Sequence, residues 1–89
     1  PAKPESGTGQ VNEGKAVLAW KASGEPDVAH YTVYEKTLFG GMDKIATVRE
    51  AAFSEPSPQK GKTKTYLITA TDRDGLESEP GAEITVTGQ

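Results

Sequence analysis

Few residues in this 89-residue chain have the side chains that catalysis or metal binding requires. His30 is the single histidine, and the nearest groups in sequence that could assist it are Asp27 and Ser23. A histidine acts as a general base when a carboxylate orients it and a nucleophile lies within hydrogen-bond reach. Ser23 has no nucleophile-turn motif around it. We therefore expect His30 to be a surface residue near the start of a strand.

The acidic turn Asp72-Arg73-Asp74-Gly75, followed by Glu77, offers carboxylates at alternate positions. Oxygen ligands spaced in this way are a feature of calcium-binding loops. Such a loop also needs an oxygen ligand at its fifth position, where this chain has Leu76. We expect a solvated turn, and calcium binding by residues 72–77 is the alternative.

The composition excludes several other kinds of site. The chain has no cysteine, so it can form no disulfide, thiolate zinc site or thiol nucleophile. It has no glycine-rich phosphate loop and no His-Glu-x-x-His motif. Its net charge is −3 with both signs interspersed, unlike the clustered lysines and arginines of nucleic-acid modules. No apolar run approaches the length of a membrane span. We expect no catalytic residue, cofactor or metal, no nucleic-acid partner and no membrane insertion.

Three apolar residues, Leu38, Phe39 and Met42, surround Gly40-Gly41 at the tip of an expected hairpin. Exposed together, they would form an apolar patch of the kind that binds partners. We expect Leu38 or Phe39 to fold back and cap the end of the fold. The alternative is that all three are solvent-accessible and contact a partner or a neighbouring domain.

Other binding candidates rest on single residues or on charge. Tyr34 faces outward in its expected strand and could be one platform of a sugar site, although such sites generally need several coplanar rings. Arg73 could make a generic contact from its loop. Lys60, Lys62 and Lys64 form the only positive cluster, on one side of an extended segment. For this cluster we favour a solvated corner over a polyanion site.

The elements that would position these side chains are strands. From Tyr66 to Ala70 large apolar residues alternate with polar ones, so Tyr66, Ile68 and Ala70 share one face. The following Asp-x-Asp-Gly stops the strand, because glycine tolerates positive φ and aspartate bonds its own backbone. A half-buried strand that ends in a tight turn is the unit of antiparallel sandwiches.

The rest of the chain repeats this pattern, with turn residues between the runs and no helical periodicity. We expect strands near residues 9–12, 15–21, 30–36, 44–49, 51–54, 66–71 and 82–87. Leu18 and Trp20 should face inward from the second strand, and Tyr31 and Val33 from the third. The pattern predicts one all-β domain over residues 10–89. Residues 1–9 should be a linker or the start of the first edge strand.

Four motifs, in this order, resemble those of fibronectin type III domains. They are Leu18-Ala19-Trp20, Tyr31-Thr32-Val33, Tyr66-Leu67-Ile68-Thr69-Ala70, and Asp72-x-x-Gly75-x-Glu77-Ser78, the last as in many bacterial extracellular members. The resemblance runs from about Gly14 to Thr87. It implies an immunoglobulin-like β-sandwich of seven strands in two antiparallel sheets, with three or four strands in each, packed over Trp20.

The resemblance also implies a tyrosine corner, in which the Tyr66 hydroxyl bonds backbone a few residues upstream. Members of the family usually have a leucine six residues before this tyrosine, where this chain has Lys60. We therefore expect Lys60 to point into solvent, with Pro58 or Phe53 covering the Tyr66 ring.

For function, the resemblance implies a non-catalytic spacer or protein-interaction module of a larger, secreted or surface bacterial protein. Its partners would be the flanking domains of the same polypeptide, and the isolated domain would be monomeric. The alternative is a module that binds a glycan or protein ligand through the Leu38–Met42 hairpin tip and Tyr34. Because the chain has no initiator methionine or signal segment, we expect it to be part of a longer polypeptide. The extracellular or cell-surface location is implied by the resemblance alone.

Overall fold

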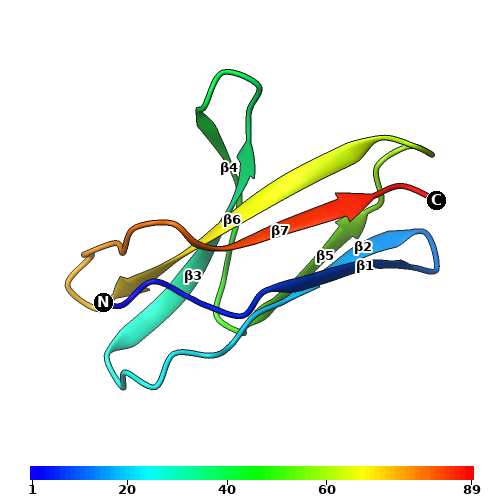
Figure 1. Cartoon of the computed structure of the whole chain (residues 1–89). Coiled ribbons are helices and arrows are strands. Elements are labelled where there is room, and N and C mark those ends of the chain that lie inside the picture. The colour runs from blue at the N-terminus through cyan, green and yellow to red at the C-terminus, as the bar shows by residue number, and fades with distance from the viewer.

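The computed structural model describes all residues from Pro1 to Gln89 and contains seven strands and no helix (Figure 1). The strands are β1 (Thr8–Asn12), β2 (Lys15–Ala19), β3 (Val28–Lys36), β4 (Met42–Val48), β5 (Ala52–Pro56), β6 (Thr63–Asp72) and β7 (Gly81–Thr87). One antiparallel sheet has the order β1-β2-β5, and the other has the order β4-β3-β6-β7. The predicted immunoglobulin-like sandwich of seven strands is confirmed. The chain has no helix of the length and apolarity that crossing a bilayer requires.

Several strand boundaries differ from those expected from the apolar runs. β3 and β6 begin earlier, at Val28 and Thr63, because their backbones pair beyond the apolar residues. β2 ends at Ala19, so Trp20 follows the strand, and its backbone N–H donates to the Ala51 carbonyl at 3.1 Å. Backbone pairing, rather than apolar alternation, decides where a strand ends.

The core lies between the two sheets and consists of the inward-facing residues of β2, β3, β6 and β7. Trp20 and Tyr31 pack edge to face, with ring centroids 5.6 Å apart and planes at 73°, an arrangement that the ring quadrupoles favour. All seven residues expected in the core are buried, and the full set is Ala16, Leu18, Trp20, Tyr31, Val33, Tyr66, Ile68, Ala70, Ile84 and Val86.

The start of the edge strand β1 lies close against β7 because two inward positions, Gly7 just before the strand and Gly9 within it, have no side chain. A Cβ on Gly9 would lie 2.5 Å from the Ile84 Cγ2 atom and 2.8 Å from the Val86 Cγ2 atom. A Cβ on Gly7 would meet Ile84 at 2.5 Å. Glycine at these positions therefore lets the backbone of one sheet's edge lie directly on the core side chains of the other.

The residues before β1 lie against the sandwich. The Pro4 carbonyl accepts a hydrogen bond from the Ala82 N–H at 2.9 Å, and the Glu5 carbonyl accepts one from the Lys21 N–H at 3.0 Å. Pro4 is buried. Within the expected segment 1–9, residues 4 and 5 are thus tied to both sheets, and the first strand begins at Thr8.

We predict that Gly9→Ala destabilises the chain by about 1–3 kcal/mol, because the added methyl group overpacks the core against Ile84 and Val86. The matched control is Gly24→Ala, since a Cβ at Gly24 meets no atom within 4 Å. Urea unfolding of both variants measures the difference. Equal stability of the two variants would contradict the close approach of β1 to β7.

Candidate functional site

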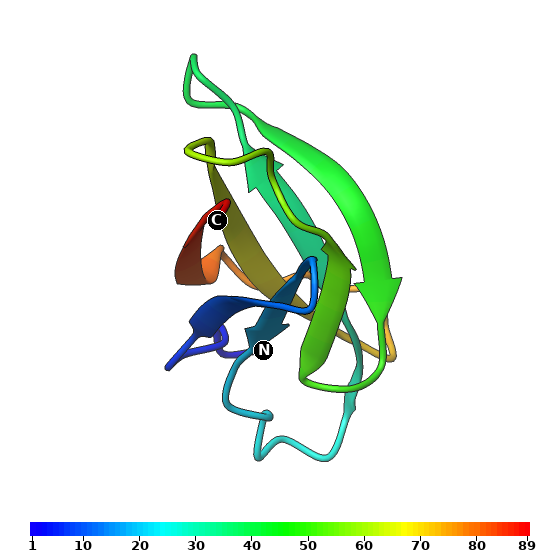
Figure 2. The ribbon, with the colours of Figure 1, turned by 90° about the vertical axis from the view of Figure 1, so that its right-hand side faces the viewer.

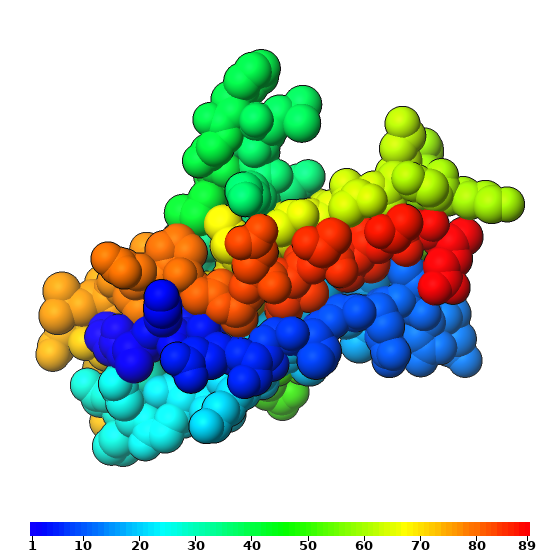
Figure 3. All heavy atoms as spheres, in the orientation of Figure 1, coloured from blue at the N-terminus to red at the C-terminus, as the bar shows by residue number.

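The hairpin between β3 and β4 projects from the body of the sandwich and carries its most exposed apolar side chains (Figures 1 and 3). Leu38 is 97% exposed, Phe39 98% and Met42 41%. The expectation that Leu38 or Phe39 caps the sandwich is therefore wrong. The turn is closed on itself by the Thr37 N–H, which donates to the Gly41 carbonyl at 2.9 Å. It lies beyond the end of the β3–β6 pairing, out of reach of the core.

A cleft of about 740 Å³ lies beside this hairpin (Figure 3). It exists because β3 pairs with β6 only as far as Glu35 opposite Tyr66, whereas β6 continues beside β7 to Thr63. The hairpin and the start of β6 therefore diverge. We call this opening the notch, and its lining residues are Glu35, Lys36, Thr37, Leu38, Phe39, Asp43, Thr63, Lys64 and Thr65.

Next to the notch, a polar cluster links the two sheets. The Tyr66 hydroxyl donates to the Glu55 Oε2 atom at 2.5 Å, and the Lys64 Nζ atom donates to the same oxygen at 2.8 Å. The Lys64 Nζ atom also lies 3.6 Å from the Glu35 carboxylate. Glu55 is on β5 of the three-stranded sheet, and the other three residues are on the four-stranded sheet. The cluster thus joins the facing layers by hydrogen bonds.

This contact corrects the expected tyrosine corner, because the Tyr66 hydroxyl bonds a side chain of the facing sheet and not upstream backbone. Alternation along β5 turns both Phe53 and Glu55 inward, which brings the Glu55 carboxylate to the end of the Tyr66 ring. Lys60 is exposed, as expected, and Phe53 packs against the core.

The electrostatics of the cluster follow from these bonds. Burial alone would raise the pKa of Glu55, but hydrogen bonds from Lys64 and Tyr66 outweigh it and hold that pKa below its ordinary value of 4.5. Burial, followed by the hydrogen bond to Glu55, raises the pKa of Tyr66 well above the usual tyrosine range. The cluster is therefore most favourable with Glu55 ionised and Tyr66 protonated.

The expected positive cluster of three lysines does not form. Lys64 alternates with Tyr66 on the inner face of β6, and its ammonium is held by Glu55 and Glu35. Lys60 and Lys62 lie exposed in the preceding loop. The corner therefore presents two free lysines and not three.

Tyr34 lies on the outer face of the four-stranded sheet and is held by the loop between β6 and β7. Its hydroxyl donates to the Glu77 Oε2 atom, which also accepts a hydrogen bond from Thr69 Oγ1 at 2.7 Å. The bond to Glu77, together with partial burial, raises the pKa of Tyr34, and the same bond lowers the pKa of Glu77. Glu77 thereby fastens its loop across the sheet and occupies the Tyr34 hydroxyl.

The acidic turn after β6 is satisfied by its own backbone. The Asp72 Oδ1 atom accepts hydrogen bonds from the N–H groups of Asp74 and Leu76, both at 3.0 Å. The Arg73 N–H donates to the Asp27 carbonyl at 3.0 Å, and the Arg73 residue is exposed. No group of three or more acidic or histidine side chains is arranged to hold a metal ion. The carboxylate of Asp72 thus serves the turn.

The four candidate binding residues do not form one surface. Phe39 lines the notch at the hairpin end of the molecule. Met42 and Tyr34 lie on the same face of the β3–β4 pair, opposite Lys36 and Lys44 respectively. Arg73 belongs to the turn that follows the far end of β6. Sequence reasoning missed Glu55 and placed Lys64 in a positive cluster, although their alternation with Phe53 and Tyr66 was a usable signal of their inward direction.

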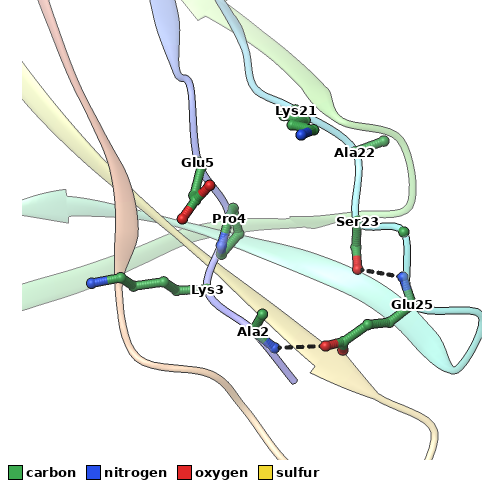
Figure 4. A pocket seen from close by; sticks show the side chains of 9 residues that line it. Ala2, Lys3, Pro4, Glu5, Lys21, Ala22, Ser23 and Glu25 are labelled. Atoms are coloured by element: carbon green, nitrogen blue, oxygen red, sulfur yellow. Dashed lines mark hydrogen bonds between the residues drawn. The ribbon is translucent and has the colours of Figure 1, made fainter.

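A smaller cleft of about 230 Å³ lies between the N-terminal segment and the loop after β2 (Figure 4). The Ala2 N–H donates to the Glu25 Oε1 atom at 3.1 Å, and the Glu25 N–H donates to the Ser23 Oγ atom at 3.0 Å. These polar groups satisfy one another within the cleft. None of the candidate binding residues lines it.

We predict that Glu55→Gln flattens the acid side of the stability profile. Because the pKa of Glu55 is lower in the folded chain than its ordinary 4.5, its contribution to stability is complete above pH 4.5 and is lost below it. Urea unfolding from about pH 3 to about pH 7 measures the change in unfolding free energy with pH. The control is Glu83→Gln, which removes an exposed ion pair with Lys36 and should keep the wild-type profile. A wild-type profile in Glu55→Gln would contradict the inter-sheet contact.

No family model and no curated protein matches the sequence. Among solved structures, the chain is similar to an Fn3-like protein from Clostridium thermocellum, with a TM-score of 0.82 and 22% identity over 100% of this chain and 94% of that one. It is similar to a β-1,2-glucanase from Parabacteroides distasonis, with a TM-score of 0.82 and 19% identity over 98% of this chain. It is also similar to the twitchin kinase region from C. elegans, with a TM-score of 0.75 and 22% identity over 93% of this chain.

This chain spans only 12% of the glucanase and 15% of the twitchin region, so in those two proteins the fold is one part of a longer polypeptide. At such identities the likeness concerns the fold alone. It agrees with the seven strands in two antiparallel sheets. The chain has the fibronectin type III fold.

Proposed function

We propose that this chain is a non-catalytic spacer module, which sets the distance and orientation between flanking domains of a larger polypeptide. The observation that carries the proposal is the position of the two termini. The molecule measures 40 × 29 × 18 Å. The N- and C-termini lie toward opposite ends of it in Figure 1, and Figure 2 shows the molecule from the side on which the C-terminus lies. A domain attached at each terminus would be held apart by the length of the sandwich.

Both terminal segments are tied down, which a spacer of defined length requires. At the N-terminal end the Pro4 carbonyl accepts from the Ala82 N–H. At the C-terminal end the Gly88 N–H donates to the Lys62 carbonyl at 2.8 Å, and the Gly88 carbonyl accepts from the Gly61 N–H at 2.9 Å. A Cβ at Gly88 would lie 2.2 Å from the Gln59 carbonyl oxygen, so only glycine allows this close fit.

The way in which the carboxylates are used supports a non-catalytic role. Glu55, Glu77 and Asp72 each accept two hydrogen bonds that fasten the structure. Their observed role is structural: Glu55 links the two sheets, and Glu77 and Asp72 hold loop residues in place.

A monomeric module in a secreted or cell-surface bacterial protein is the finer form of the proposal. It is supported by the resemblance of the Asp72–Ser78 loop to that of bacterial extracellular members and by the fold likeness to two bacterial proteins. The flanking domains of the same polypeptide are its proposed partners.

A second candidate function is ligand binding through the hairpin tip, and the exposure of Leu38 and Phe39 favours it. Large apolar side chains that are almost fully exposed at a projecting tip are typical of contact surfaces. Of the two ligand classes, a glycan is the weaker, because sugar sites generally need several coplanar rings and Tyr34 does not line the notch beside Phe39. A protein ligand needs no second aromatic platform.

The spacer function predicts a single, narrow end-to-end distance. The chain has no cysteine, so Ala2→Cys with Gln89→Cys provides two unique sites for fluorophores. Single-molecule energy transfer should show one narrow population. Gly81→Ala should broaden it, because a Cβ there lies 2.0 Å from the Pro4 carbonyl oxygen and displaces the N-terminal segment. Gly24→Ala serves as the control. A broad distribution of label-to-label distances in the chain that has only the two cysteine substitutions would rule out a rigid spacer.

If the hairpin tip is a ligand-binding surface, its apolar side chains can be removed without loss of folding stability. Leu38→Ser combined with Phe39→Ser should change the unfolding free energy by less than about 0.5 kcal/mol, because both side chains are exposed. Thermal unfolding followed by circular dichroism measures this. A loss of several kcal/mol would mean that the tip packs on the sandwich after all.

A further inference from the structure

We propose that the notch binds a short extended segment of a protein partner, which adds a strand to the free edge of β6 and places a basic side chain near Glu35 and Asp43. This inference rests on the second candidate function, ligand binding at the hairpin tip, and names the class of ligand. Three observations carry it, and they concern the backbone, the apolar wall and the charge of the notch.

The backbone at the start of β6 has a strand partner on one side only. Thr63, Lys64 and Thr65 pair with Thr87, Val86 and Thr85 of β7, while the register between β6 and β3 ends at Tyr66. Successive residues of a strand turn their N–H and C=O groups toward opposite edges. This part of β6 therefore presents backbone donors and acceptors to the notch. An extended peptide is the ligand that pairs with such an edge.

The hairpin supplies an apolar wall on the other side of the notch. Leu38 and Phe39 both line it, and both are almost fully exposed. In strand addition, main-chain hydrogen bonds give affinity. Contacts between alternate side chains of the peptide and the surfaces beside the strand edge give specificity. An apolar side chain of the bound segment would contact Leu38 and Phe39.

The charges around the notch favour a basic ligand. Lys64 is neutralised by Glu55 at 2.8 Å, and Lys36 lies 3.5 Å from Glu83. The two lining carboxylates are Asp43, which has no ion pair, and Glu35, which shares Lys64 with Glu55. The lining residues carry two carboxylates and two ammonium groups, but Glu55 and Glu83 hold the two ammonium groups, so Asp43 is left without an ion pair.

The loop lysines Lys60 and Lys62 do not line the notch. Neither of them forms an ion pair with Asp43. A lysine or arginine of the bound segment would complete the ion pairing of Asp43.

The test uses the full chain labelled with ¹⁵N and an octapeptide in which valine and lysine alternate. Titration should shift the amide signals of Thr63, Lys64 and Thr65 together with those of Leu38 and Phe39. The same peptide with its lysine amides N-methylated, which removes one row of backbone donors, should bind at least about ten-fold more weakly. A peptide of alternating valine and glutamate should also bind more weakly.

Variants of the chain then separate the apolar wall from the charge. Leu38→Ser with Phe39→Ser should strongly lower the affinity for the valine–lysine peptide, and Asp43→Asn should lower that affinity about three-fold. Leu76→Ser removes another exposed apolar residue, which lies in the β6–β7 loop away from the notch, and should leave binding unchanged. A salt titration should reduce the effect of Asp43→Asn.

Three results would overturn the proposal. They are equal binding of the N-methylated peptide, shifts confined to residues outside the notch, and binding of the tip to phosphatidylcholine–phosphatidylserine vesicles in place of either peptide. An absence of peptide binding would reject the notch ligand while leaving the spacer function intact, because the end-to-end distance tests that function independently.

Discussion

The structure depends on Tyr66, the largest fully buried side chain of the chain. Its ring fills the space between the sheets, and its hydroxyl crosses to Glu55 of the facing sheet. A polar group taken out of water must be paired, because an unpaired one costs on the order of 1–3 kcal/mol. Glu55 is in turn paired by Lys64, so packing and hydrogen bonding fix the same relation between the layers. A rigid spacer needs such a fixed relation.

The same contact marks where the four-stranded sheet divides. The β3–β6 register ends at Glu35 and Tyr66, and beyond this pair the hairpin and the start of β6 diverge. The polar cluster closes the end of the core at this point, so the diverging strands need no further apolar cover. The hairpin is left free to carry Leu38 and Phe39 into solvent. The polar cluster therefore separates the buried core from the solvent-filled notch.

Much of the fold could be predicted from local patterns. Alternation placed Trp20, Tyr31 and Tyr66 in the core, and Asp-x-Asp-Gly marked the end of β6, where Asp72 binds its own turn. The exposed hairpin tip could not be predicted in this way, because it depends on how far β3 and β4 pair beyond β6. The Tyr66–Glu55 contact depends on the alignment of two sheets, which no single strand specifies. For that reason the candidate site was predicted only in part: Phe39 was expected to cap the sandwich but is exposed, and Arg73 lies far from it.

The most direct test of the account is a double-mutant cycle on Tyr66→Phe and Glu55→Gln, measured by urea unfolding at neutral pH. If the hydroxyl and the carboxylate join the two sheets, the two substitutions share one interaction, and the cycle should give a coupling energy of about 1–2 kcal/mol. Effects that simply add, with no coupling beyond about 0.3 kcal/mol, would show that the layers are not held by this contact.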